Sequence, residues 1–94
     1  MKDMKNLSES LEKVLKDYNL EKAFKQSQVF ELWEEVVGTR IAQNSTPVRM
    51  DRGKLVIQVQ SPAWRNEIQY YHEQIKREIN KRLKEEVVKK IVFT

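Results

Sequence analysis

The 94-residue chain has no cysteine, two glycines, two prolines and one histidine. The lack of cysteine excludes disulfides, Cys-ligated zinc and thiol chemistry. Two glycines are too few for a glycine-rich phosphate loop. No stretch approaches the about 18 apolar residues of a transmembrane helix, and Met1–Asn6 lacks the apolar run of a signal peptide. We therefore expect a cytoplasmic protein.

Catalytic and metal-binding patterns are also missing from the sequence. No Ser, Cys or Asp is spaced to form a triad with His72, the single histidine. Glu34 and Glu35 are adjacent, but consecutive helical residues diverge by about 100° and do not converge on one atom. Because no metal-ligand spacing occurs either, we expect no enzyme, no metal and no cofactor.

The charge balance is mildly basic, with 18 Lys+Arg against 14 Asp+Glu and a net charge of +4. Residues 61–94 carry most of this excess. Such a bias permits contact with nucleic acid without requiring it, and a solvated basic helix face is the more ordinary interpretation. The length fits one domain over residues 1–94.

Apolar periodicity predicts two helices in the first half of the chain. The first runs over 6–19, with Asn6 and Glu9 as a capping pair. A turn or second cap is expected at 25–28, before a helix over 27–42 with a wide apolar stripe. Gly38 lies inside that pattern, which indicates a helix end, a close packing contact or, more rarely, backbone approach to a ligand.

The second half predicts a hairpin, a long helix and a last strand. Residues 48–50 and 55–59 bracket a turn at Gly53, and the second strand alternates between core and half-exposed positions. Ser61-Pro62 is a strong start for a helix over 62–84. Residues 87–93 complete a three-stranded sheet. The expected fold class is α+β in the order α-α-β-β-α-β, with helices packed on one face of the sheet.

The candidate binding residues are basic, because phosphate neutralisation needs lysine and arginine. The candidates around the hairpin and on the last helix are Arg49, Arg52, Lys54, Arg65, Lys76, Arg77, Lys81 and Arg82. Aromatic residues on the apolar stripes are predicted to pack in the core rather than to stack on bases. A structural role is assigned to Trp33, Gly38, Pro47 and Trp64.

An ordered set of residues from Val29 to Phe93, about two thirds of the chain, resembles the DciA-like family of small bacterial proteins. The matching residues are Trp33-Glu34-Glu35-Val36-Val37-Gly38, Ile41-Ala42, Thr46-Pro47, Gly53-Lys54-Leu55, Val59, Trp64 and Ile91-Val92-Phe93.

The resemblance implies a K-homology-like (KH-like) domain with a family-like core over 27–94 and a part in bacterial DNA replication. DciA proteins act with the replicative DnaB-type helicase and promote its loading onto DNA without hydrolysing ATP themselves. The Gly-x-x-Gly loop of true K-homology domains is absent after Gly38, which disfavours sequence-specific RNA recognition by that route.

The leading hypothesis is a non-enzymatic module that binds the replicative helicase and single-stranded or branched DNA, mainly through phosphates. One alternative is a stand-alone RNA- or DNA-binding domain with no helicase partner. Another is a scaffold or oligomerisation module that uses its long C-terminal helix.

Overall fold

The computed structural model describes the backbone of residues 2–94 and the side chains from residue 9 onward. Five helices and three strands occur in this range, and the predicted α+β class is confirmed. In order they are α1 (Lys2–Asp17), α2 (Glu21–Val37), α3 (Thr39–Ala42), β1 (Thr46–Asp51), β2 (Lys54–Gln58), α4 (Pro62–Tyr70), α5 (His72–Leu83) and β3 (Lys90–Phe93). No helix among the described residues is long and apolar enough to cross a membrane.

The three strands form a mixed sheet in the order β1-β2-β3. The central strand, β2, pairs antiparallel with β1 and parallel with β3. A parallel pair needs a long crossover, and α4 and α5 supply it. Leu55 pairs with Met50 on one side and with Ile91 on the other, so these three side chains share the face toward the helices. Lys54 and Lys90, also partners, share the opposite face.

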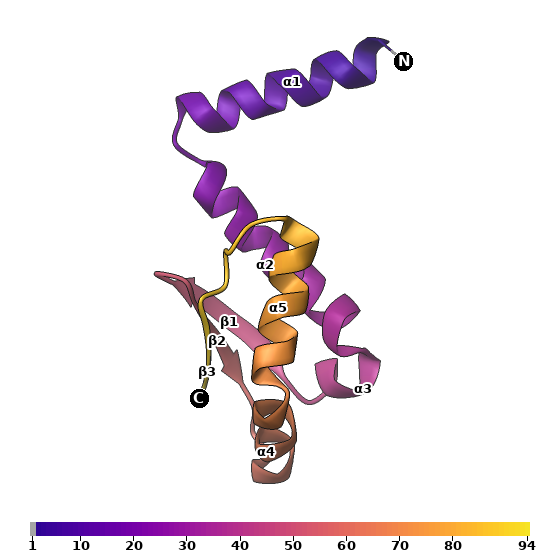
Figure 1. Ribbon diagram of the computed structural model, residues 1–94, viewed down its shortest axis with the longest axis vertical. Helices are drawn as coiled ribbons and strands as arrows, with labels where there is room; N and C mark the ends of the chain where they lie inside the picture. The colour runs from indigo at the N-terminus through magenta and orange to yellow at the C-terminus, as the bar shows by residue number, and fades with distance from the viewer. Residues whose placement is uncertain (1) are drawn as a thin grey trace.

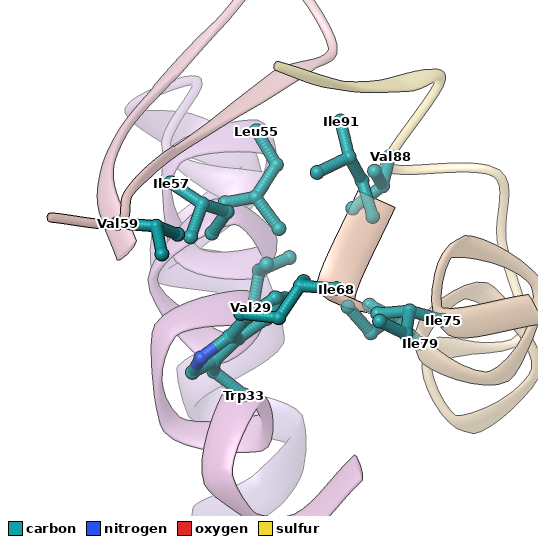
Figure 2. Packing of buried hydrophobic residues seen from close by; sticks show 10 residues of the cluster. All are labelled: Val29, Trp33, Leu55, Ile57, Val59, Ile68, Ile75, Ile79, Val88 and Ile91. Atoms are coloured by element: carbon teal, nitrogen blue, oxygen red, sulfur yellow. The ribbon is translucent and has the colours of Figure 1, made fainter. Parts of the chain in front are cut away.

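The core fills the space between that inner face and helices α2, α4 and α5 (Figure 2). It consists of Val29, Trp33, Leu55, Ile57, Val59, Ile68, Ile75, Ile79, Val88 and Ile91. Most of these residues are aliphatic or β-branched, as suits the interior of a small α+β domain.

Trp33 supplies the one large aromatic ring of this core. Its indole nitrogen donates to the hydroxyl of the buried Ser45 at 3.0 Å, and that hydroxyl donates to the carbonyl of Ile41 at 2.7 Å. This relay ties α2 to the segment between α3 and β1, and it satisfies a buried N–H that would otherwise be costly.

The hairpin turn between β1 and β2 has two residues in the left-handed region, Arg52 with φ of 52° and Gly53 with φ of 84°. Two positive φ values in a two-residue loop are the mark of a type I′ turn. The prediction of a short hairpin at Gly53 is therefore confirmed.

The N-terminal helix differs from the prediction at its start. Because α1 begins at Lys2, Asn6 lies inside the helix and does not cap it. The end is close to the prediction, since α1 stops at Asp17 and Asn19 turns the chain with φ of 56°. The predicted turn at 25–28 is wrong: α2 runs through it without a break.

The predicted helix over 27–42 is two helices, separated at Gly38. This residue has φ of 89°, and its N–H bonds to the carbonyl of Glu34 as the C-cap of α2. A Cβ built at Gly38 meets nothing within 4 Å, so the backbone angle, rather than crowding, favours glycine here. Of the interpretations weighed for Gly38, the helix end is the correct one.

The single helix expected over 62–84 is also wrong. The serine cap and the start at Pro62 are confirmed, with the Ser61 hydroxyl accepting from the N–H of Trp64 at 3.4 Å. The helix then breaks at Tyr71, whose N–H bonds back to the carbonyl of Ile68 at 3.0 Å. This i to i−3 bond tightens the backbone into a turn that separates α4 from α5.

The last strand, β3, is shorter than the expected 87–93, because residues 84–89 form a connection clamped by Asn80. Its side-chain amide donates to the carbonyl of Val88 at 2.8 Å and accepts from the Val88 N–H at 2.9 Å. Val88 is thereby held in the core, and β3 is aligned along β2.

Helix α1 projects from one end of the molecule (Figure 1). The Cα radius of gyration is 15.3 Å, whereas a compact chain of this length has about 12 Å. Its main contact is with α2. The sheet and the other helices therefore form a body, and α1 is an arm attached to it.

Candidate nucleic-acid interface

Basic side chains gather where the hairpin turn meets the start of β3. Gly53 accepts the backbone N–H groups of Lys89 and Lys90 at 2.8 and 3.2 Å, which brings this end of β3 onto the turn. Lys54 and Lys90 are partners in the parallel ladder. We call Arg52, Lys54, Lys89 and Lys90 the hairpin cluster. All four side chains are exposed, with Asp51 as the acidic neighbour in the β1–β2 register.

A groove continues from the hairpin cluster between β3 and the start of α5. Its lining is Gln69, His72, Glu73, Lys89, Lys90, Ile91 and Phe93, around a volume of about 420 Å³. We call it the β3 groove. Ile91 is buried and Phe93 is half-buried, so the floor is apolar while lysines stand on the rim. An apolar floor with a cationic rim matches a nucleotide, which has a flat base and a charged phosphate.

Glu73 is the acidic member of the β3 groove and is held by a neighbouring lysine. The ammonium of Lys76 donates to its carboxylate at 3.0 Å, and this bond with the lysine charge lowers the pKa of Glu73. His72 Nε2 lies 3.5 Å from the same carboxylate, while His72 Nδ1 lies 2.7 Å from the carbonyl of Gln69. The histidine therefore braces the turn between α4 and α5.

The structure brings only some of the predicted basic residues together. Arg52 and Lys54 join the hairpin cluster, and Arg49 is exposed nearby on β1. Lys76 borders the β3 groove through Glu73. Arg77 and Lys81 are exposed on α5.

Two of the predicted residues have other bonds. Arg65 was expected near the hairpin turn but lies at the opposite end of β2, where Nη2 donates to the carbonyls of Val59 and Thr94 at 3.1 and 3.0 Å. Arg82 faces α2, with ion pairs to Glu35 at 3.0 Å and to Glu78 at 3.3 Å. Both residues hold elements of the fold together.

The residues assigned a structural role occupy different environments. Trp33 is in the core, and Gly38 ends α2. Trp64 is half-buried against the core, with the Arg40 guanidinium 5.4 Å from its ring centroid. Pro47 lies in β1 beside a bulge between Pro47 and Arg49, where a missing N–H is tolerated.

Sequence reasoning missed Lys89, Lys90 and Tyr70 as surface candidates. Side chains alternate in direction along a strand, so Lys90 points to the face opposite Ile91, which indicates that Lys90 faces away from the core. The nearness of Lys90 to Lys54 depends on the parallel pairing of β2 with β3, which is not a local feature. Tyr70 was assigned to the middle of a long helix, whereas it ends α4 with 82% of its surface exposed.

A second surface is an apolar stripe on the arm. Leu11 is 49% exposed, Val14 47% and Tyr18 70%, and Leu20 and Phe24 extend the exposed apolar surface onto α2. Leu11 and Val14 lie on one face of α1, and Tyr18, the first residue after the helix, continues that face because its N–H still bonds to the carbonyl of Val14 at 3.1 Å. We call Leu11, Val14 and Tyr18 the α1 stripe. An amphipathic helix of this kind suits insertion into an apolar groove of a partner protein.

No group of three or more His, Cys, Asp or Glu side chains that could hold a metal ion occurs among the described residues. The fold and surface together define a small α+β domain with a basic sheet edge and an apolar arm. Compared with known families, the chain matches the family described as Dna[CI] antecedent, DciA, over residues 6–93. The chain therefore belongs to the DciA family. Membership of this family is consistent with a helicase-loader role in replication. The comparison with curated proteins gives no match.

Proposed function

We propose that this protein is a non-enzymatic module of bacterial DNA replication that engages the replicative DnaB-type helicase and single-stranded or branched DNA. The observation that carries the proposal is the DciA family match over residues 6–93. The two surfaces of the molecule support it, because one has the chemistry for a protein partner and the other for a polyanion.

In this proposal the α1 stripe binds the helicase. The core cluster lies entirely in the body, so the stripe is not needed to fill it. Exposed apolar side chains on a projecting helix are typical of a surface that a partner covers. Burial of Leu11, Val14 and Tyr18 would supply the apolar contact that such docking needs.

The DNA surface is the hairpin cluster together with the β3 groove. Its lysines and arginine neutralise phosphates, so binding is expected to be indifferent to sequence and to weaken steeply as salt rises. The mild net charge of +4 fits a module that relies on this local surface rather than on an overall positive field.

Co-elution with the hexameric helicase of the same organism on a sizing column tests the helicase part. The variant combines Leu11→Ser, Val14→Ser and Tyr18→Ser, and we expect it to elute separately from the hexamer. The matched control places three serines on the polar side of α1, at Glu9, Lys13 and Lys16, and should co-elute as the wild type does. Co-elution of the stripe variant would contradict the assignment of α1.

The alternative function is a nucleic-acid-binding domain with no helicase partner, which the hairpin cluster and β3 groove favour. It predicts that the wild type shifts a labelled oligonucleotide while eluting apart from the helicase at every salt concentration. If neither partner is bound, both functions are wrong, and a scaffold role remains. The long helix that first suggested a scaffold is two separate helices, α4 and α5.

A further inference from the structure

Two adjacent tyrosines stand at the turn between α4 and α5. Tyr70 is 82% exposed and Tyr71 is 40% exposed. Their ring centroids are 5.0 Å apart with an interplanar angle of 83°, an edge-to-face arrangement. This geometry leaves the larger part of the Tyr70 ring in contact with solvent, while its neighbour limits its movement.

Core packing does not explain the position of Tyr70. Ile68, two residues earlier, is fully buried and anchors α4 to the core. Consecutive helical side chains diverge by about 100°, so a residue two places from the buried one points away from the body. The exposure of Tyr70 agrees with this geometry, and the ring is left as an available surface.

The turn that carries Tyr70 is well braced. The N–H of Tyr71 bonds to the carbonyl of Ile68 at 3.0 Å, and His72 Nδ1 lies 2.7 Å from the carbonyl of Gln69. A ring fixed on a braced turn loses little freedom when a ligand binds, which favours affinity.

The β3 groove begins at this same turn. Gln69 and His72, which flank the two tyrosines in sequence, line the groove together with Lys89 and Lys90. Tyr70 directly follows the groove residue Gln69 in the chain, so its backbone lies at the end of the groove opposite the hairpin cluster, while its ring is not part of the groove lining. Glu73 is the acidic side chain in between, and Lys76 neutralises it at 3.0 Å.

We propose that Tyr70, which packs against Tyr71, stacks on an unpaired base of single-stranded DNA whose phosphates follow Lys89 and Lys90 toward the hairpin cluster. The inference rests on the DNA-binding part of the proposed function and assigns its base contact. Stacking suits every base, so this contact adds affinity for unpaired strands without adding sequence preference. It also gives a reason for discrimination against duplex DNA, in which the bases are already stacked.

The test is fluorescence anisotropy with a fluorescein-labelled oligothymidylate of about 15 nucleotides, a length within the range covered by small single-strand-binding folds. Tyr70→Ala is expected to raise Kd by about 5- to 150-fold, the range that corresponds to loss of one base–aromatic stack. Tyr70→Phe keeps the ring and should bind within about two-fold of the wild type. Phe24→Ala removes another exposed aromatic side chain, on α2, and is the control, with no change expected.

Two further measurements separate stacking from electrostatics. With an oligonucleotide of the same length that carries abasic sites, Tyr70→Ala should bind as the wild type does, because no base remains to stack. The slope of log Kd against log salt should be the same for Tyr70→Ala and wild type. Lys89→Ala combined with Lys90→Ala should reduce that slope by about 1.4, or about 0.7 per phosphate contact on a single strand.

Each outcome decides a different part of the proposal. If the wild type binds the oligonucleotide and Tyr70→Ala binds equally well, stacking is wrong and the DNA-binding function stands. If Tyr70→Ala weakens the abasic strand or a duplex as much as the base-containing strand, the residue acts through something other than a base, and stacking is again wrong. If the wild type binds no oligonucleotide at low salt, the DNA-binding function itself fails. Thermal melting of each variant checks that the fold is retained.

Discussion

At the scale of single residues, the polar atoms placed inside this small core are few and specifically paired. Trp33 brings an indole N–H into an otherwise aliphatic cluster, and Ser45 is the buried hydroxyl that receives it. The same hydroxyl donates onward to Ile41, so one serine connects α2, α3 and the entry to β1. A small domain gains from such a link, because its core has little apolar area to spare.

Ser45→Ala is predicted to destabilise the protein by about 1–3 kcal/mol, because the buried Trp33 N–H loses its acceptor. The measurement is urea or guanidinium unfolding followed by tryptophan fluorescence and circular dichroism. The exposed Ser10 on α1 offers a control, since Ser10→Ala should leave the unfolding midpoint unchanged. An unaltered midpoint for Ser45→Ala would mean that water replaces the hydroxyl.

Arg52 occupies a backbone position that suits asparagine or glycine better than arginine, with φ of 52° in the type I′ turn. Arg52→Asn is predicted to stabilise the fold by about 1 kcal/mol, since asparagine tolerates the left-handed region. The same change should weaken oligonucleotide binding and reduce the salt slope by about 0.7, because one phosphate contact is lost.

Thermal melting and anisotropy at several salt concentrations measure these two effects on one variant. Arg77→Asn, on the exposed face of α5, is a control that removes the same charge away from the turn. If Arg52→Asn stabilises the fold without any loss of binding, the hairpin turn lies outside the DNA surface.

At the scale of elements, the arm and the body differ in what stabilises them. The core residues come from α2, β2, α4, α5, β3 and the connections after β2 and before β3, and α1 adds none from the side chains described. An isolated helix of this length is marginal in water. Helix α1 must therefore be stabilised largely by its contact with α2 near the turn at Asn19 and by any partner that binds its apolar stripe.

Removal of residues 2–17 is accordingly predicted to shift the melting temperature by less than about 5 °C, which corresponds to about 1 kcal/mol for a domain of this size. Circular dichroism should lose helical signal in proportion to the deleted segment, while the near-ultraviolet signal of Trp33 and Trp64 stays. Removal of β3 is the contrasting deletion: Ile91 is in the core, so this change should unfold the body. A large loss of stability without α1 would show that the arm packs on the body in solution.

Local signals in the sequence predicted some element boundaries and missed others. The hairpin at Gly53 and the start of α4 at Ser61-Pro62 were predicted, because both depend on residues with restricted or unusual backbone preferences. The end of α2 at Gly38 was one of the interpretations weighed, but the helix was predicted to continue to residue 42. The break at Tyr71 has no such residue, and tertiary packing overrides a continuous helical pattern there. The segment 25–28 is polar but tolerates helix, so its composition wrongly indicated a turn.

The candidate site was predictable only in part for the same reason. Arg52 and Lys54 lie at a recognisable turn, so their proximity could be predicted from the neighbouring residues in the sequence. Lys89 and Lys90 join them through the parallel pairing of β3 with β2, which is a long-range contact. Arg65 was misplaced although the order of elements is enough to place it: the hairpin turn precedes β2 and α4 follows it, so the turn and Arg65 lie at opposite ends of the strand.

At the scale of the whole molecule, the α1 stripe is well separated from the turn that carries Tyr70, whereas the hairpin cluster lies nearer the arm. Arg52 and Lys89 line one hollow with Glu21 and Lys22 at the start of α2. The molecule measures 50 × 27 × 19 Å, with α1 at one end of the long axis and α4 near the other (Figure 1). The α1 stripe therefore lies far from the turn that carries Tyr70. One small domain with binding surfaces on different elements can hold a protein partner and a nucleic-acid strand at the same time.

Separation of this kind predicts that the two activities are lost independently. Changes at sites more than about 10 Å apart with no shared contacts usually have additive effects. The variant with serine at Leu11, Val14 and Tyr18 should elute apart from the helicase and bind the oligonucleotide with the wild-type Kd. The variant with alanine at Lys89 and Lys90 should lose oligonucleotide binding at moderate salt and still co-elute with the helicase. Only the wild type should bring a labelled strand into the helicase fraction through both contacts. If each variant loses both activities while its melting curve matches the wild type, the helicase and the DNA share one surface, and the division between arm and groove is wrong.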